Sequence, residues 1–441
     1  MEILIQAGQL ILSLSILIVL HEFGHYLPAR AFKTRVEKFY LFFDYKFSIF
    51  KKKIKDTEWG IGWIPLGGYV KISGMIDESM DKEQMEQPPQ PWEFRTKPAW
   101  QRLIIMIGGI VVNLIVGMVI YSLVLFTWGK EYIAGEDLPH GLAVSQEYEA
   151  YGFQDGDMIL EVGGEKLKNV LDVNKYILLR GSRDIKVQHP DGEIETIQLR
   201  EDADYELFQS GNMSAFSPRI NAKIGEVVPE MPASKAGLLK NDIIKSVNDY
   251  SINYWDQFSD TIKKFKNEEV LLVVERDGVI DSIMVLPDTV GQIGVAPDGA
   301  EFKSWVKTEK FSFFESIPAG IGLAYWTLHD YAAQLKFLFT SKGASSMGGF
   351  GAFGKMFQPQ WDWHTFWLNT ALISIILAFM NFLPIPALDG GHIMFLLYEM
   401  ITGRKPHQKV LEYAQIIGFI LILGLVLYAN GNDIYKAITG K

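Results

Sequence analysis

His21-Glu22-Phe23-Gly24-His25 follows directly after an apolar stretch that runs from Ile3 to Leu20. A helix needs about 20 residues to cross the hydrocarbon core of a bilayer and tolerates slightly fewer, so the stretch is predicted to be a membrane span. The chain begins with Met1-Glu2 rather than with basic residues, and no small-residue cleavage site follows the stretch. We therefore interpret it as a retained span and not as a signal peptide.

Three further apolar stretches are long enough to cross a bilayer. They run from Leu103 to Phe126, from Phe366 to Phe382 and from Tyr413 to Ala429. In a chain of 441 residues, these blocks leave room for two or three folding units and their connectors. The sequence thus predicts a multi-pass α-helical membrane protein with four transmembrane helices.

The composition excludes several classes of function. A formal net charge of -10 disfavours a nucleic-acid partner, because such proteins generally need a basic surface to displace counterions from phosphates. The chain contains no cysteine, so it forms no disulfide and has no thiolate nucleophile. Any zinc ion must therefore be bound by histidine and carboxylate side chains.

Basic residues mark the side of the membrane on which each connecting segment lies. Those that follow the first span closely are Arg30, Lys33, Arg35, Lys38, Lys51, Lys52, Lys53 and Lys55. By the positive-inside rule, this segment is cytoplasmic. Both termini and the stretch 129–365 are then extracytoplasmic, and the short turn that holds Arg404, Lys405 and Lys409 is again cytoplasmic.

The spacing of the two histidines indicates a metal site. On a helix, His21 and His25 project from one face about one turn apart, so both imidazoles can reach one ion. A zinc ion there lowers the pKa of a bound water toward ~7, and Glu22 is suited to take its proton and pass it to a leaving amine. These polar residues are costly to bury in hydrocarbon unless they are paired or coordinating. The motif predicts a zinc hydrolase that cleaves peptide bonds without a covalent intermediate.

A catalytic zinc ion usually takes three protein ligands and leaves one position for water. Asp389 is the candidate for the third ligand, because it terminates the third span at the cytoplasmic side, level with the two histidines. Pro384 and Pro386 break the helix before it, and non-helical backbone at membrane depth must be buried in protein or line a wet cavity. The alternative is a polar helix end with a Gly-Gly turn. Glu399 and His392 are rival ligands, although His392 is better suited to support Asp389.

The stretch between the second and third spans is typical of α+β domains. Short valine-rich runs bounded by charges, such as Glu269 to Arg276, are followed by turn pairs such as Asp277-Gly278. The stretch also repeats, because residues 151–163 (YGFQDGDMILEVG) are similar to residues 235–248 (KAGLLKNDIIKSVN). The second copy closely resembles a PDZ domain, and the first resembles one more loosely. We expect two extracytoplasmic PDZ domains in tandem.

These motifs together resemble the site-2 protease family of zinc intramembrane metalloproteases, and within it the sigma-E-regulating type with two PDZ domains. The resemblance covers nearly the whole chain. Besides the PDZ pair, it rests on HEFGH at 21–25, PLGGYVK at 65–71, GGIVVN at 108–113 and LDG at 388–390. It implies that zinc is bound by His21, His25 and Asp389, that Glu22 is the general base, and that Asn381 holds substrate near the metal. An asparagine suits that role, because an unwound substrate frees amides that need partners in a low-dielectric site.

The block from Gly67 to Ile72 matches the membrane-reentrant β-loop of the family. The resemblance implies that an extended substrate binds to its edge by strand addition, through Gly67, Gly68, Tyr69, Val70 and Lys71. An ordinary glycine turn before a soluble strand is the alternative. The chain departs from the family pattern at Ile376, where some members carry another asparagine, and in residues 347–354, which lack the usual Gly-Pro pattern.

The predicted domain boundaries follow from the spans, the repeat and the resemblance. They are 1–26 (first transmembrane helix), 27–102 (cytoplasmic segment with the reentrant β-loop), 103–128 (second transmembrane helix), 129–213 and 214–300 (PDZ domains), 301–365 (connector with an amphipathic interfacial helix), 366–388 (third transmembrane helix), 389–410 (LDG motif and cytoplasmic turn) and 411–430 (fourth transmembrane helix).

The resemblance implies an endopeptidase of the bacterial inner membrane that cuts the transmembrane segment of single-span proteins. Candidate substrates are an anti-sigma factor and signal-peptide remnants, cut after an upstream site-1-type protease has acted. The periplasmic PDZ pair then excludes large ectodomains or, alternatively, docks a partner's C-terminus. Two other classes compete with the enzyme. A membrane-anchored PDZ scaffold without proteolytic activity explains only the PDZ pair, and four spans without internal repeats are few for a transporter.

Overall fold

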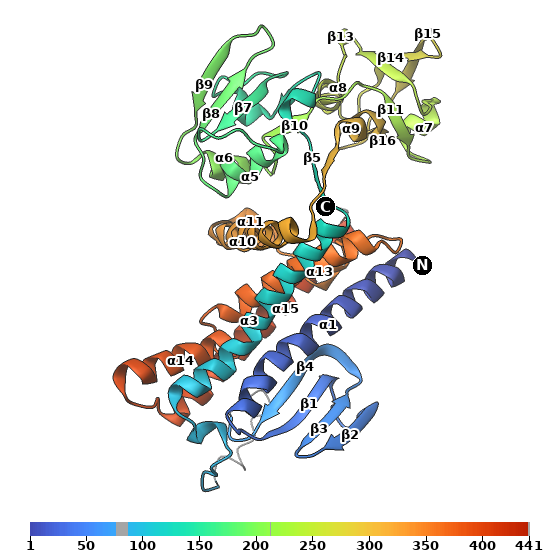
Figure 1. The fold of residues 1–441 in the computed structure, drawn as a ribbon. Coiled ribbons are helices and arrows are strands. Elements are labelled where there is room, and N and C mark those ends of the chain that lie inside the picture. Colours follow the sequence, from blue (N-terminus) through green and yellow to red (C-terminus); the bar gives the residue numbers. More distant parts are fainter. Residues whose placement is uncertain (76–86, 212, 440–441) are drawn as a thin grey trace. The chain divides into compact units, whose positions relative to one another are not determined.

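The computed structural model describes residues 1–75, 87–211 and 213–439 (Figure 1). The chain divides into two compact units. Met1–Gly129 and Lys310–Lys441 form one, here called the membrane unit, and Lys130–Glu309 form the other, here called the inserted unit. The sequence of the membrane unit is therefore interrupted by the inserted unit.

Four described helices of the membrane unit are long and apolar enough to cross a membrane. They are α1 (Glu2–Ala31), α3 (Ala99–Thr127), α13 (Trp363–Phe382) and α15 (Gln408–Thr439). Their most apolar windows have mean hydropathies of 2.3, 2.8, 1.6 and 2.3. The prediction of a multi-pass helical membrane protein with four spans is confirmed at this level.

Helix α3 is the centre of the membrane unit. It packs against α1, α13, α10 (Phe313–Leu338) and α14 (Asp389–Thr402), and Figure 1 shows α1 and α3 running side by side. Where α1 meets α3, a Cβ atom on Gly108 would lie 1.9 Å from the carbonyl oxygen of Gly24. Only glycine allows this approach, so the two backbones touch at the residue that directly precedes His25.

The ends of two helices differ from the sequence prediction. Helix α1 continues through Pro28 to Ala31, so the boundary placed at residue 26 falls inside it. Helix α13 ends at Phe382 rather than at 388, because Pro384 and Pro386 lack the N–H that a helix requires. Asp389 therefore does not terminate the third span.

Asp389 is instead the first residue of α14, so the segment 389–410, predicted to hold the LDG motif and a cytoplasmic turn, begins with a helix, and its turn is confined to the residues between α14 and α15. Gly390 and Gly391 lie in the first turn of this helix, where a Cβ atom on Gly390 would be 2.0 Å from the carbonyl oxygen of Leu383. The two glycines thus let α14 start directly against the end of the third span. An acidic residue is also favoured at this position by the helix dipole.

A four-stranded sheet follows α1. Its strands are β1 (Val36–Phe43), β2 (Phe50–Ile54), β3 (Thr57–Ile61) and β4 (Ile64–Ile72), in the order β2-β3-β1-β4. Strand β4 is antiparallel to β1 and forms one edge of the sheet. The glycine block 67–72 therefore lies within an edge strand. Aromatic rings of Phe23, Phe39 and Trp59 join the sheet to α1.

Short helices and α10 connect the inserted unit to the third span. These helices are α10, α11 (Ser341–Ser346) and α12 (Phe350–Lys355). A separate one-turn helix, η1 (Phe94–Thr96), precedes α3. Helix α10 is the helix predicted between 301 and 365. A capping box begins it, because Ser312 N donates to Glu315 Oε2 over 2.8 Å. Its interfacial position stays a prediction.

The inserted unit consists of two halves with nearly the same order of elements. The first contains β6 (Leu142–Val144), α4 (Gln146–Glu149), β7 (Met158–Val162), α5 (Val173–Leu178), β8 (Asp184–Gln188), β9 (Ile194–Gln198), α6 (Ala203–Ser210) and β10 (Phe216–Pro218). The second contains β11 (Ile224–Val227), α7 (Pro232–Ala236), β12 (Ile243–Val247), β13 (Tyr250–Ser251), α8 (Trp255–Ile262), β14 (Val270–Arg276), β15 (Val279–Val285) and β16 (Val295–Pro297), followed by α9 (Ala300–Trp305).

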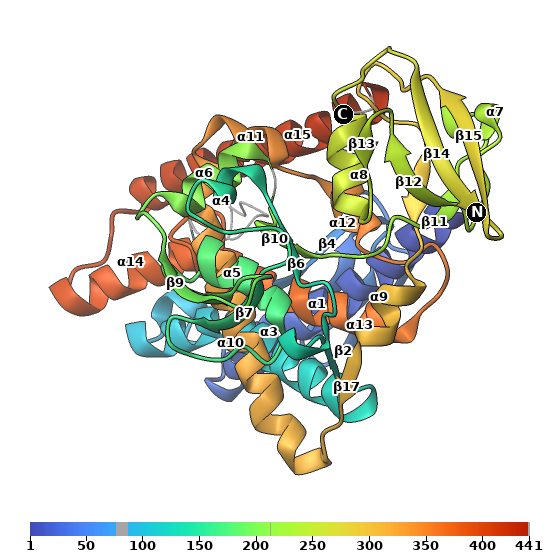
Figure 2. The same cartoon turned by 90° about the horizontal axis from the view of Figure 1, so that it is seen from above.

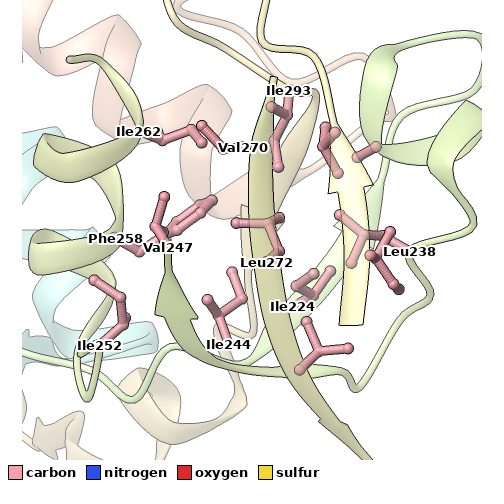
Figure 3. Packing of buried hydrophobic residues seen from close by; sticks show 14 of the residues in the cluster. Ile224, Leu238, Ile244, Val247, Ile252, Phe258, Ile262, Val270, Leu272 and Ile293 are labelled. Atoms are coloured by element: carbon pink, nitrogen blue, oxygen red, sulfur yellow. The ribbon is translucent and has the colours of Figure 1, made fainter. Parts of the chain in front are cut away.

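Each half is built around an antiparallel sheet, with the order β7-β8-β9 in the first half and β13-β12-β14-β15 in the second. Figure 2 shows α8 beside β12 in the second half. Figure 3 shows the core between them, to which β12, β14 and α8 contribute Ile244, Val247, Val270, Leu272, Phe258 and Ile262. Strands β5 (Lys130–Tyr132) and β17 (Lys307–Glu309) pair where the unit begins and ends.

The sequence repeat corresponds to a structural repeat. Asp157 and Asp242 stand at equivalent positions just before β7 and β12, and both are fully buried. Each accepts a hydrogen bond from the backbone N–H three residues earlier, over 2.9 Å and 2.8 Å. Each also pairs with a basic side chain at the end of the next long strand, Asp157 with His189 and Asp242 with Arg276, over 2.7 Å in both cases.

Candidate metal centre

Three predicted ligand residues converge in the membrane unit. The Nε2 atoms of His21 and His25 are 3.2 Å apart, because one helical turn of α1 separates the residues. Asp389, at the start of α14, brings its Oδ2 atom to 3.3 Å from each Nε2 atom. Within the described part of the chain, this trio is the group with the spacing of metal ligands.

The triangle of these atoms fits a zinc ion. Bonds from zinc to histidine nitrogen and carboxylate oxygen are about 2.0–2.2 Å long, so two ligand atoms at a tetrahedral angle lie roughly 3.3 Å apart. The three observed edges of 3.2, 3.3 and 3.3 Å match this separation. Asp389 Oδ2 is also buried, and among the described residues no hydrogen-bond donor is directed at it. A cation bound by all three atoms would leave one tetrahedral position open.

Helix α3 holds the far side of both imidazoles. His25 Nδ1 donates to the carbonyl oxygen of Ile105 over 2.8 Å, which leaves the Nε2 lone pair directed at the centre. His21 Nδ1 lies 3.1 Å from the side-chain amide of Asn113. Gly109 lies between these two contacts, and a Cβ atom there would be 2.4 Å from His25 Nε2. The helix can pass this close only because that position has no side chain.

A cavity of about 680 Å³ opens beside the trio. Glu22 lines it next to the histidines, and Asn381 lines it from α13, with its amide nitrogen 3.5 Å from His21 Nε2. The block of β4 from Gly67 to Ile72 forms another wall. The structure thus brings every site residue predicted from the sequence to one cavity.

Charged and hydroxyl groups fix the sheet edge beside this cavity. Tyr69 donates to one oxygen of Asp44 over 2.8 Å, and Lys38 donates to the other over 3.2 Å. Burial alone would raise the pKa of Asp44, but these hydrogen bonds outweigh it and hold the pKa below its ordinary value. Burial, with the added effect of Asp44, raises the pKa of the Tyr69 hydroxyl, which stays protonated. The side chain of Tyr69 is therefore anchored at the edge of the cavity that this residue lines.

The two rival ligands contact other residues. Glu399 accepts from Arg102 over 2.5 Å, in an ion pair that joins α14 to α3. His392 lines the cavity, but its Nε2 atom lies 3.1 Å from the side-chain amide of Gln415 on α15. Neither belongs to the trio. The suggested support of Asp389 by His392 stays a prediction.

Sequence reasoning gave no role to Asn113, although it stands in the GGIVVN block. It is almost fully buried in the middle of a span. A polar residue in an apolar helix is itself a sign of function, and this sign was available in the sequence. The partner of Asn113 could not be predicted from the sequence, because His21 is on another helix.

A histidine pair on a helix able to span a membrane, joined by a carboxylate to form a trio that fits zinc, is the arrangement of a membrane metallopeptidase. The model of peptidase family M50 matches residues 9–425, and the chain belongs to this family. The chain is 30% identical to a Vibrio cholerae protein named as a zinc metalloprotease, over 96% of the chain and 97% of that protein.

Two further relatives carry more specific names. Protease RseP of Yersinia pestis is 28% identical, over 98% of the chain and 99% of the relative. The regulator of sigma E protease of Haemophilus influenzae is 26% identical, over 99% and 100%. The protein is thus a metalloprotease of the site-2 protease family, and zinc is its cofactor.

Proposed function

We propose that the protein is an intramembrane endopeptidase that hydrolyses a peptide bond in the transmembrane segment of single-span membrane proteins. One observation carries this proposal. The zinc-compatible trio comes from the apolar helix α1 and from the start of α14. The cavity beside this trio is also lined by an edge strand. A substrate must lose its helix before it is cut, and an edge strand offers the freed backbone new hydrogen bonds.

In this proposal, His21, His25 and Asp389 hold the zinc ion. When bound, zinc polarises the scissile carbonyl and lowers the pKa of a water molecule toward ~7. Glu22 takes the proton of that water as general base and then passes it to the nitrogen of the leaving amine. Asn381 donates from its amide to a substrate carbonyl. No covalent intermediate forms.

The edge of β4 binds the substrate in an extended form, through Gly67, Gly68, Tyr69, Val70 and Lys71. Two features support this role. The block lines the cavity, and the strand forms one edge of its sheet. A Cβ atom on Gly68 would lie 2.6 Å from a methyl group of Ile18 on α1, so this position favours glycine. The membrane-reentrant position of the sheet belongs to the same proposal.

The two halves of the inserted unit act as PDZ domains, over 129–213 and 214–300, that lie in the periplasm with both chain termini on that side. They keep large ectodomains from the cavity, so an upstream protease must trim the substrate first. The names of relatives that regulate sigma E support an anti-sigma factor as substrate, in a bacterial inner membrane. Signal-peptide remnants are further candidates.

The test compares three purified proteins for bound zinc and for cleavage of a single-span substrate. Glu22→Gln should keep its zinc and lose activity by about 10²–10⁴-fold, because only the proton transfer is removed. Asp389→Ala should lose both zinc and activity. Glu2→Gln, at the other end of α1, is the matched control and should resemble the wild type. Full zinc and activity in Asp389→Ala would refute the ligand set, and an active Glu22→Gln would refute the general base.

A further inference from the structure

Asn113 on α3 contacts His21 through Nδ1, the ring nitrogen that does not face His25 and Asp389, and it also lines the cavity. Its amide nitrogen is 3.1 Å from His21 Nδ1, and its amide oxygen is buried without a hydrogen-bond donor among the described residues. The side chain is 1% exposed. The backbone is also fixed, because Ser374 Oγ on α13 donates to the Asn113 carbonyl over 2.7 Å.

The direction of the hydrogen bond decides which nitrogen of His21 can bind a metal. An amide N–H that donates to Nδ1 requires the imidazole proton on Nε2, and a protonated Nε2 has no lone pair for a cation. Nε2 is nevertheless the atom that faces His25 and Asp389. A hydrogen bond from the Asn113 N–H to Nδ1 and zinc binding through Nε2 therefore exclude each other.

A half-turn of the amide removes the conflict. It exchanges the oxygen and nitrogen of Asn113, so that the oxygen accepts a proton held on His21 Nδ1. The neighbouring imidazole already has this arrangement, because His25 Nδ1 donates to the carbonyl of Ile105. Ile105 and Asn113 are eight residues apart on α3 and therefore share one face of the helix.

We infer that Asn113 is a positioning residue for the metal centre: its amide oxygen accepts from Nδ1–H of His21 and fixes the tautomer that presents Nε2 to zinc. Helix α3 then supplies one carbonyl oxygen to each imidazole, from the backbone at Ile105 and from a side chain at Asn113. This inference rests on the proposed role of His21 as a ligand. According to this inference, the second span contributes to the affinity of the protein for zinc.

The experiment measures zinc affinity of the full-length protein in detergent, by competition with a chelator. Asn113→Leu keeps the size of the side chain but removes the acceptor, so zinc should bind about 10–100-fold more weakly. Asn113→Asp offers acceptors and, when ionised, no donor, so its affinity should equal or exceed that of the wild type. Thr370→Val removes a buried hydroxyl in α13, whose hydrogen bond goes to Phe366, and should leave affinity unchanged.

Each outcome has one meaning. Wild-type affinity in Asn113→Leu, or a loss in Asn113→Asp as large as in Asn113→Leu, would overturn the inference, the second because a donor would then be needed. If Asn113→Leu does not fold, Asn113→Asp alone decides between acceptor and donor. His21→Ala separates this inference from the proposed function. If that variant keeps wild-type affinity, the ligand set fails; if it loses zinc while Asn113→Leu does not, only the role of Asn113 fails.

Discussion

At the scale of single residues, the metal centre depends on a missing side chain as well as on those present. A Cβ atom on Gly109 would lie 2.4 Å from Nε2 of His25 and 2.6 Å from Cε1 of His21. Both distances are well below van der Waals contact, which begins near 3.5 Å for carbon. A methyl group on residue 109 would therefore force the imidazoles or α3 to move.

Gly109→Ala should therefore weaken zinc binding by about 10-fold or more, as changes next to metal ligands commonly do. Gly8→Ala on α1 is the matched control, because a Cβ atom at that position meets no atom within 4 Å. Zinc titration of both variants checks the expectation. Equal affinities would mean that α3 can move away from the histidines without cost.

A second residue-scale prediction concerns the repeat. The hydrogen bond to buried Asp157 raises the pKa of His189, so folding favours its protonated form. The stability that this pair contributes is complete below the unfolded pKa of about 6.5 and is lost as pH rises through the higher folded value. Arg276 holds the equivalent place beside Asp242 and stays charged throughout.

Hydrogen exchange, corrected for intrinsic rates, should therefore show protection of β7 and β8 falling as pH rises from 6 to 9, while protection of β12 and β14 stays constant. His189→Gln should abolish the difference between the halves. A parallel decline in both halves of the wild-type protein would show that His189 does not control it.

At the scale of elements, α14 places the third candidate ligand. The ion pair between Arg102 and Glu399 joins it to α3, and both side chains are largely buried, with exposures of 9% and 12%. Removing one partner leaves an uncompensated buried charge, which typically costs about 3–5 kcal/mol, whereas an apolar pair of similar volume is tolerated. Arg102→Met should thus lower the thermal unfolding midpoint clearly, and Arg102→Met with Glu399→Leu should recover most of the loss.

The control for this pair is exposed Lys166 beside Glu136, where Lys166→Met should have no measurable effect. Thermal unfolding in detergent, with and without added zinc, provides the measurement. If the double variant is as unstable as Arg102→Met alone, α14 depends on the ion pair itself and not merely on a filled interface.

The elements also show what the sequence could and could not predict. Four spans and the histidine spacing follow from local patterns, because hydropathy and a helical turn need no knowledge of the rest of the fold. Helix α14 was not predicted, because the short segment between the third and fourth spans was interpreted as a turn and Gly390 and Gly391 are poor helix formers. In the structure Gly390 packs closely against the backbone of Leu383 and Gly391 against that of Pro386, and such tertiary contacts cannot be read from local preference. For the same reason, the partner of Asn113 was not foreseen.

At the scale of the whole molecule, the inserted unit begins and ends at one pair of strands. Tyr132 of β5 lies opposite Lys307 of β17, so residues 133–306 leave and return at adjacent points. A two-residue turn can join antiparallel strands, so this segment can be replaced without altering the strands themselves. The filter proposed for the PDZ pair can therefore be tested by excision.

A protein in which two glycines replace residues 133–306 should cleave a single-span substrate that still carries its full ectodomain, while the wild type should cleave only the trimmed form. The control replaces the same residues with an unrelated domain of similar size whose termini are adjacent. Cleavage assays on trimmed and untrimmed substrates provide the readout. Unchanged selectivity after excision would favour a docking role over a filter.

The interruption of the membrane unit also sets the order in which the centre is assembled during synthesis. His21 and His25 are made early, and the proposed third ligand follows only after the second span and the whole inserted unit. At about 5–20 residues per second, roughly 20–70 s separate the histidines from Asp389. With the proposed ligand set, a nascent chain lacks a complete metal centre throughout this interval. Delay in translation does for this protease what an inhibitory propeptide does for many others.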